Sequence, residues 1–388
     1  MASPQEFIPF AVPDIGEAEV NAAAEAIRSG WLTTGPSVAA FEEEFAQFVG
    51  GGVQAIAVNS ATAGLHLALE AAGVSAGDEV LVPTWTFTAT AEVVRYLGAT
   101  PVLVDVDQAT LCIDFESASA AVTSRTRAIM PVHMAGMAVD GKRLEEFCQN
   151  FGLVAIEDAA HALPATSTGT MVGAGASLAT VFSFYATKTI TTGEGGMVVT
   201  RDPAVARRIK TMRLHGISRD VFDRYRSTSP SWFYEVVAPG YKYNLTDPAA
   251  AIGRVQLARA WELRDKRAAI SARYSTAFNG MPLELPSQPR EGDVHSWHLY
   301  IVRLAAEAPI DRDGLISRMH ELGVGCSVHF IPLHKHPVWR DLGGYDDTDF
   351  PVASKEFQRV VSLPIFSAMM PNQVQRVIDA LTMALDAR

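Results

Sequence analysis

The chain has 388 residues, 48% of them hydrophobic and 19% charged, a balance typical of a compact globular protein. Its formal net charge of −11 argues against a nucleic-acid partner and against an anionic membrane surface. The three cysteines, Cys112, Cys148 and Cys326, are scattered and odd in number, which predicts reduced thiols in a cytoplasmic protein. The amino-terminal segment does not resemble a signal peptide, and no apolar stretch is long enough to span a bilayer.

Short apolar runs alternate with helical patterns between about residues 53 and 200, which predicts an α/β fold with a mostly parallel sheet covered on both faces. The predicted strands are Val53–Val58, Glu79–Val82, Val102–Asp105, Ala128–Val132, Leu153–Glu157, Thr180–Phe184 and Met197–Thr200. The predicted helices between them are Ala61–Ala72, Thr86–Leu97, Phe115–Val122 and Asp140–Phe151. Ligands of such sheets bind at the carboxyl ends of the strands.

The pattern changes after Thr200. A helix over Arg207–Leu214 precedes a long ordered loop over Gly216–Tyr243, and a long helix begins at Asp247-Pro248 and extends to about Tyr274. A smaller α+β unit follows, with strands at His298–Leu304 and Gly325–His329 and helices at Arg312–Leu322, Val352–Arg359 and Asn372–Leu385. We therefore expect a large domain over 1–250 and a small carboxy-terminal α+β domain over 251–388.

Lys188 is the first candidate for chemistry. It follows the apolar run Phe182–Tyr185 and precedes the glycine-rich segment Gly193–Gly196, so it is predicted at the end of a buried strand. Lysine is seldom buried, and burial lowers its pKa and frees the amine for Schiff-base chemistry. A surface lysine in a loop is the alternative interpretation of this residue alone.

Two further strand ends carry polar groups. Ser60 and Thr62 stand where a helix begins, a place that suits a phosphate, although an ordinary helix cap is the favoured interpretation of this segment taken alone. Asp158 ends the apolar strand before Ala159-Ala160-His161, where a cationic ring nitrogen would stabilise a buried carboxylate. The alternatives are a carboxylate that caps the next helix and, for His161, a buried histidine with no ligand.

Aromatic residues complete the pattern. Trp85 and Phe87 lie in Pro83–Thr90 at another strand end, where one of the two can stack on a flat cofactor while the other packs in the core. The aromatic and polar segment Ala238–Asp247 is suited to completing a site, including that of a partner subunit. An amine, an acid, an aromatic and a phosphate cup are the groups that pyridoxal phosphate needs. Lys188, Asp158, Trp85 or Phe87, and Ser60/Thr62 with Ser183 supply them in that order.

These segments resemble the DegT/DnrJ/EryC1/StrS family of sugar aminotransferases, which have fold type I. The likeness runs from Ser29–Pro36 to Leu363-Pro364, and its most specific pieces are Glu157–His161, Ser183–Gly196 and Gly240–Asp247. The resemblance implies that the cofactor is pyridoxal 5′-phosphate and that the protein is a homodimer with shared active sites. It implies that Lys188 forms the covalent bond and transfers the proton, that Asp158 contacts the ring nitrogen, that Phe87 stacks on the ring and that His161 contacts the ring hydroxyl. It assigns the phosphate to Ser60, Ala61, Thr62 and Ser183, and the phosphate of the partner's site to Asn244. It assigns substrate contacts to Thr33, Tyr185 and His329.

The resemblance also implies the reaction. Some members of the family carry histidine in place of the lysine and dehydrate sugars, so Lys188 favours transamination. The segments Asn59–Gly64, Glu157–His161 and Pro239–Asp247 are similar to the enzyme that makes UDP-4-amino-4-deoxy-L-arabinose, whereas Val328–His334 follows the generic pattern of the family. We therefore expect transfer from L-glutamate to a nucleotide-linked keto-sugar, with carbon four as the preferred position. The alternatives are a 3-keto-sugar or cyclitol aminotransferase and a regulatory protein that binds the cofactor without turnover.

His329, His334 and His336 do not predict a metal site, because Pro332 and Pro337 interrupt any regular ligand spacing. Substrate specificity is expected in loops such as Gly216–Val237.

Overall fold

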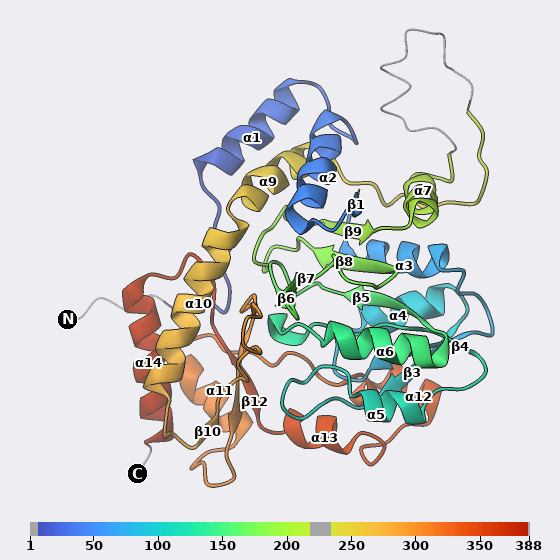
Figure 1. Cartoon of the computed structure of the whole chain (residues 1–388). Helices are drawn as coiled ribbons and strands as arrows, with labels where there is room; N and C mark the ends of the chain where they lie inside the picture. The colour runs from blue at the N-terminus through green and yellow to red at the C-terminus, as the bar shows by residue number, and fades with distance from the viewer. Residues whose placement is uncertain (1–6, 218–233, 387–388) are drawn as a thin grey trace.

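The computed structural model is built around a central seven-stranded sheet that lies between helices (Figure 1). It describes residues 7–217 and 234–386. Across the sheet, the strands are β1 (Gln54–Val58), β9 (Gly196–Thr200), β8 (Ala179–Ser183), β5 (Val154–Asp158), β4 (Thr126–Ile129), β2 (Glu79–Pro83) and β3 (Thr100–Val104). The pairings from β8 to β3 are parallel, whereas β9 is antiparallel to both neighbours. The expected mostly parallel α/β sheet is therefore confirmed.

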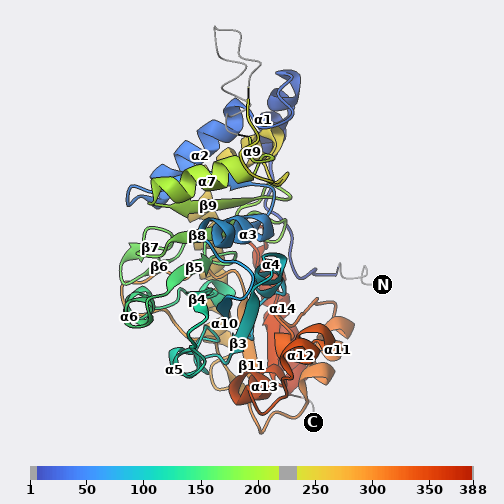
Figure 2. The same cartoon turned by 90° about the vertical axis from the view of Figure 1, so that its right-hand side faces the viewer.

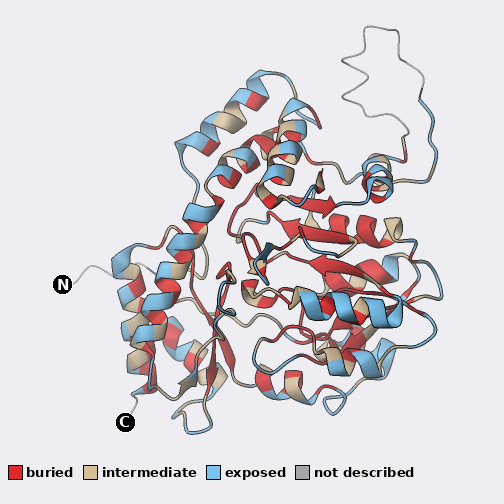
Figure 3. Ribbon diagram, in the orientation of Figure 1, coloured by how far each residue is buried: buried red, intermediate tan, exposed pale blue. Residues whose placement is uncertain are grey.

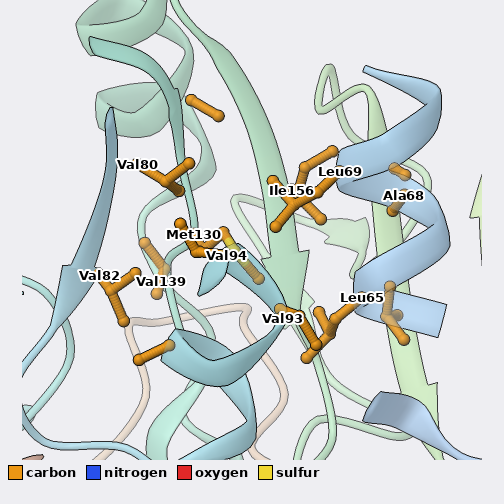
Figure 4. Packing of buried hydrophobic residues seen from close by; sticks show 14 of the residues in the cluster. Leu65, Ala68, Leu69, Val80, Val82, Val93, Val94, Met130, Val139 and Ile156 are labelled. Atoms are coloured by element: carbon orange, nitrogen blue, oxygen red, sulfur yellow. The ribbon is translucent and has the colours of Figure 1, made fainter. Parts of the chain in front are cut away.

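Helices cover both faces of the sheet, because alternate residues of a strand point to opposite sides. One face carries α3 (Ala61–Ala71), α4 (Ala89–Tyr96) and α7 (Pro203–Met212), and the other carries α2 (Pro36–Val49), α5 (Phe115–Ala120), α6 (Gly141–Phe151) and α9 (Asp247–Ala258) (Figures 1 and 2). Along β5, Ile156 points toward Leu69 of α3 (Figure 4), whereas Ala155 clusters with Leu144 of α6. Adjacent residues of one strand thus pack against helices on opposite faces of the sheet.

The strands of this sheet are almost wholly buried, while the outward faces of the helices are exposed (Figure 3). In β2, Val80, Leu81 and Val82 are all fully buried. A strand that is covered on both faces carries such continuous apolar runs, which is why the sequence revealed these strands. Among the helices within residues 7–217 and 234–386, none is both long and apolar enough to cross a membrane.

A second, smaller sheet organises the carboxy-terminal part. Its antiparallel strands are β10 (Leu283–Glu284), β11 (Tyr300–Leu304) and β12 (Val360–Leu363). The helices of this part are α10 (Ala260–Ala277), α11 (Arg312–Glu321), α12 (Pro337–Gly343), α13 (Pro351–Phe357) and α14 (Pro371–Leu385). A separate apolar cluster that includes Tyr274, Val302 and Leu381 joins this sheet to α10 and α14. The division near residue 250 stays a proposal about two domains.

Two predicted elements were wrong. The helix expected from Asp247 to Tyr274 is two helices, α9 and α10, which meet at Arg259 with φ −99° and ψ 1°. The Arg259 guanidinium is bound there by Asp14 and Glu19, each at 2.9 Å, from the segment around α1 (Glu17–Arg28). The strand expected at Gly325–His329 is reduced to isolated bridges: Val324 pairs with Ile8, and Ser327 pairs with Ser362 of β12.

Other helices and strands were not predicted from the sequence. These are α1, α2, α12, β10, β12 and the hairpin of β6 (Thr166–Ser167) and β7 (Thr170–Met171). Most of the loop predicted over Gly216–Tyr243 lies outside the described residues, which resume at residue 234.

Asp247 joins the start of α9 to the start of α2. Its buried carboxylate accepts backbone N–H groups of Gly35, Ser37 and Val38 at 2.7, 3.0 and 3.1 Å. Amides in the first turn of a helix have no partner within the helix, so the carboxylate satisfies them. A Cβ atom at Gly35 would lie 2.8 Å from Oδ2 of Asp247, which explains why glycine stands there.

Asp247→Ala should lower the free energy of unfolding by about 2 kcal/mol or more, because it leaves several buried N–H groups without an acceptor. Asp202→Ala is the matched control. Asp202 also accepts two backbone amides, those of Ala204 and Val205 at the start of α7, but it is exposed, so its removal should cost about 1 kcal/mol. Denaturant titration measures both. Equal losses in the two variants would contradict the importance of the buried contact.

Candidate active site

A cavity of about 520 Å³ lies where β5 and β8 end and α3 begins. Its volume suits a small-molecule ligand. Ten of the predicted site residues line it: Ser60, Ala61, Thr62, Phe87, Asp158, His161, Ser183, Tyr185, Lys188 and His329. Segments that are far apart in the chain thus meet at one edge of the sheet, as the strand-end motifs predicted. The roles of the individual residues stay predictions.

Lys188 stands in a tight turn after β8, in which its backbone N–H donates to the carbonyl oxygen of Tyr185 at 2.9 Å. The side chain is half-buried and lines the cavity. Burial lowers the pKa of Lys188 to about 8; the Asp158 carboxylate opposes this shift and the Arg267 guanidinium adds to it. The amine is therefore more nucleophilic near neutral pH than an ordinary lysine amine.

Asp158 is the last residue of β5 and is buried. Its Oδ2 atom accepts the Thr90 hydroxyl at 2.9 Å, and its Oδ1 atom accepts the backbone N–H of Ala160 at 3.1 Å. Burial raises the pKa of Asp158, against the lowering effect of Ala160, Thr90 and Lys188. Two neutral donors hold the carboxyl group in place, and a cationic partner from a ligand would stabilise its charged form.

The start of α3 forms the rim of the cavity. Ser60 is its N-cap residue, with Oγ accepting the backbone N–H of Ala63 at 3.1 Å, and the first helical amides are those of Ala61 and Thr62. A Cβ atom at Gly196 would lie 2.8 Å from the Ala61 nitrogen, so β9 approaches this turn closely because it has glycine there. Ser60 is thus a helix cap, and the amides that follow lie at a helix N-terminus, a position that can bind an anion.

The two candidate aromatics have different environments. Trp85 is fully buried, and its Nε1–H donates to the carbonyl oxygen of His329 at 3.0 Å. Phe87 lines the cavity, is 57% exposed and lies 5.7 Å from the ring of Phe330. Trp85 is therefore a core residue, and Phe87 is the aromatic available to a ligand.

Three histidines line the cavity in surroundings that disfavour the charged form of their rings. The rings of His161 and His298 are 4.3 Å apart, and their Nδ1 atoms are buried without a hydrogen-bond partner among the described residues. Burial lowers the pKa of both well below the usual value, and the charge of Lys188 acts in the same direction. The Nδ1 atom of His329 is hydrogen-bonded to the Ser362 hydroxyl at 3.1 Å, and its ring stacks on Phe10. Burial lowers the pKa of His329 to about 4. These rings can bind a ligand as neutral donors or acceptors.

His334 does not line the cavity, and the Thr84 and Ser354 hydroxyls occupy its two ring nitrogens at 2.8 and 3.0 Å. Within residues 7–217 and 234–386, no group of three or more histidine, cysteine or acidic side chains is arranged to hold a metal ion.

Two predicted site residues lie outside the cavity lining. Thr33 is exposed, and Asn244 donates from Nδ2 to the Thr34 hydroxyl at 2.8 Å. The carbonyl oxygen of the Asn244 side chain accepts Lys242 Nζ at 2.7 Å. A contact of Asn244 with the site of another subunit therefore stays a proposal.

Four residues at the site were not predicted from the sequence: Phe10, Thr90, His298 and Phe330. His298 precedes the apolar strand β11, and this position was a usable signal for a site residue. Phe10 carried no such signal, because only the fold brings the amino-terminal segment to the cavity.

The chain is similar to known proteins over nearly its whole length. The family described as DegT/DnrJ/EryC1/StrS aminotransferases matches residues 13–382. The spore coat polysaccharide biosynthesis protein SpsC of Bacillus subtilis is 44% identical over 377 residues, which cover 97% of this chain and 96% of SpsC.

Solved structures agree with this likeness. Spr1654 of Streptococcus pneumoniae superposes with a TM-score of 0.91 in its PMP-form and 0.90 in its PLP-form; the PMP-form is 33% identical and the match covers 98% of this chain and 99% of that one. PseC of Helicobacter pylori, an aminotransferase involved in the biosynthesis of pseudoaminic acid, superposes with a TM-score of 0.89 at 27% identity, over 98% of this chain and 100% of PseC.

In the cofactor-free protein, the amine of Lys188 should titrate at about pH 8. Asp158→Asn should lower this value, because the carboxylate favours the charged amine. Amine-specific labelling at a series of pH values, quantified by mass spectrometry for each lysine, measures the titration. Lys142 on the surface of α6 provides the reference in the same digest. A Lys188 titration near the ordinary lysine value of about 10.4 would contradict the burial of this amine.

Proposed function

The chain belongs to the DegT/DnrJ/EryC1/StrS aminotransferase family, and we propose that it moves the amino group of L-glutamate to carbon four of a nucleotide-linked keto-sugar. It is a transaminase of fold type I, and its cofactor is pyridoxal 5′-phosphate. The observation that carries the proposal is the meeting of Lys188, Asp158 and the start of α3 in one cavity.

The residues of the cavity fit this cofactor. Lys188 offers the amine for the covalent bond, and Asp158 is complementary to a protonated ring nitrogen. The first turn of α3, together with Ser183, offers donors for the phosphate. The Nδ1 atom of His161, buried and without a partner in the described part of the chain, suits a polar group of the ring. When bound, the cofactor supplies an electron sink for the negative charge that develops at the substrate α-carbon.

Lys188 is placed to move the proton in both halves of the reaction. Because its pKa is lowered to about 8, a useful fraction of the amine is neutral near physiological pH. Nζ can then take the proton from the α-carbon of glutamate and return it later in the cycle. Asp158 keeps the ring nitrogen protonated, and Thr90 and Ala160 keep the carboxyl group in its orientation.

The acceptor is proposed to be a sugar from three observations. SpsC is named for polysaccharide biosynthesis, and PseC for the biosynthesis of pseudoaminic acid. His329 and Tyr185 line the cavity, and because Ser362 occupies Nδ1 of His329, the Nε2 atom is the nitrogen left for a sugar hydroxyl. The resemblance of Asn59–Gly64 and Pro239–Asp247 to a 4-keto-sugar enzyme supports amination at carbon four. Most of the proposed specificity loop Gly216–Val237 lies outside the described residues.

We further propose a cytoplasmic homodimer in which each subunit completes the site of the other. Asn244 and Lys242 stand together at the end of β1, outside the cavity of their own chain. Within the single chain, the Asn244 side chain bonds Lys242 and Thr34, and we propose that a donor of this pair turns to the phosphate of a neighbouring subunit in the dimer.

Glutamate should convert the loaded protein to the amino form of the cofactor, and a UDP- or dTDP-linked 4-keto-sugar should convert it back. His329→Ala should slow only the sugar step, by about tenfold, because it removes a hydrogen bond to the sugar. Single-turnover absorbance measures each step, and His320→Ala on the surface of α11 is the control. If only 3-keto-sugars or cyclitols convert the amino form of the cofactor back, the proposed position of amination is wrong. If no amino donor changes the form of the cofactor, a regulatory protein becomes the favoured interpretation.

Asn244→Ala should weaken cofactor retention without altering the fold, because it removes a phosphate contact from the neighbouring subunit. Gel filtration followed by absorbance gives the bound fraction, and sedimentation gives the assembly. The exposed Asn279→Ala is the matched control. A fully active monomer would rule out shared sites.

A further inference from the structure

Arg267 is a buried cation behind the wall of the cavity. It lies on α10, is only 3% exposed and does not line the cavity itself. Its Nη1 atom donates to the carbonyl oxygens of Ile365 at 2.8 Å and His298 at 3.3 Å, and both of these residues do line the cavity. The Nε atom is buried and has no hydrogen-bond partner among the described residues.

The Arg267 guanidinium has no direct counter-ion among the described residues. Across residues 7–217 and 234–386, no carboxylate lies within ion-pair distance of Arg267. Arg213, which is buried to a similar degree, pairs with Glu42, and Arg303 lies 3.5 Å from Glu356. A buried charge without an opposite charge is costly. The fold therefore keeps a buried positive charge next to the reaction site that no direct ion pair neutralises, since the Asp14 carboxylate acts on it only from beyond ion-pair distance.

This charge shapes the field inside the cavity. The carbonyl oxygens of His298 and Ile365 are bonded to Arg267 behind the wall, so they do not present acceptors to a ligand. The guanidinium is near enough to contribute, after burial, to the lowered pKa of Lys188 and of His298. Asp158 is the buried acid of the cavity, and its charge is matched by the ring nitrogen in the proposed function. The proposed function also assigns the cofactor phosphate to the first turn of α3 and Ser183, so a substrate anion is the complement that remains for Arg267.

The geometry points to Arg267 as a positioning residue that selects the α-carboxylate of the amino donor through the wall formed by His298 and Ile365. The inference rests on the proposed function, because it concerns the donor in that reaction. The α-carboxylate is bonded to the same carbon as the reacting amino group, so it must lie near Lys188, where the charge of Arg267 acts. The diphosphate of a nucleotide-sugar is many bonds from its reacting carbon and is less affected.

The test compares L-glutamate with L-isoglutamine, which carries an amide in place of the α-carboxylate and keeps the γ-carboxylate. In Arg267→Gln, the amide can still donate to a wall carbonyl, but the charge is gone. The preference for glutamate over isoglutamine, as the ratio of kcat/KM in the donor step, should fall by about tenfold or more, because charges interact strongly away from water. Arg267→Lys should keep most of the preference, and Arg273→Gln, on the exposed side of α10, should keep all of it.

A second measurement does not need turnover. In the cofactor-free protein, the labelling titration of Lys188 should move to higher pH in Arg267→Gln and stay in place in Arg273→Gln, because a neighbouring cation has been removed. Thermal unfolding and cofactor absorbance establish that each variant is folded.

The outcomes are distinct. An unchanged donor preference in folded Arg267→Gln overturns the inference, and so does its loss in folded Arg267→Lys, which keeps the charge. If Arg267→Gln does not fold, Arg267→Met, which also removes the charge, replaces it in both measurements. If the wild-type protein reacts with neither donor, the proposed glutamate donor is refuted. If the wild-type protein prefers glutamate and the variants show the same preference, only the role of Arg267 is refuted.

Discussion

The site depends on the removal of one amine and one carboxyl group from bulk water. Burial lowers the pKa of Lys188 and raises that of Asp158, although the attraction between the two groups opposes both shifts. Desolvation therefore outweighs their mutual attraction, and both groups are biased toward their neutral forms. A close ion pair would have held both charges and left neither group for a third partner. Their separation within one cavity leaves both available to the cofactor.

The parallel sheet produces this arrangement from local sequence. β5 and β8 are neighbours and parallel, so Asp158 and the turn after Ser183 reach the same edge of the sheet. Because side chains alternate along β5, Glu157 points away from the cavity, where it lies 2.9 Å from Nε2 of His133. Two adjacent acidic residues thus have different surroundings, one in a buried pair and one facing the ligand.

The carboxy-terminal part closes the cavity from the other side. His298, His329 and Phe330 reach it from this part, and Arg267 supports its wall. Phe10 joins them because the backbone of Ile8 is bonded to Gly323 and Gly325, which carries the amino-terminal segment across. The large sheet thus supplies the groups that suit the cofactor, whereas the smaller sheet and its helices supply neutral rings and one unpaired cation.

The sequence alone determined the α/β class, the seven strands of the main sheet, the cofactor and most of the cavity, because each rests on short-range patterns. Continuous apolar runs mark strands that are buried on both faces, and polar groups at their ends mark the ligand edge. The tertiary structure decided the surroundings of the two aromatics, of which the resemblance had assigned ring stacking to Phe87: the Trp85 indole donates to the carbonyl oxygen of His329 in the core, whereas Phe87 lines the cavity. It also decided the break at Arg259, the loss of the strand after Val324 and the position of Arg267. These features depend on contacts between residues far apart in the chain, such as Arg259 with Asp14 and Ile8 with Gly323, and local patterns carry no information about such contacts.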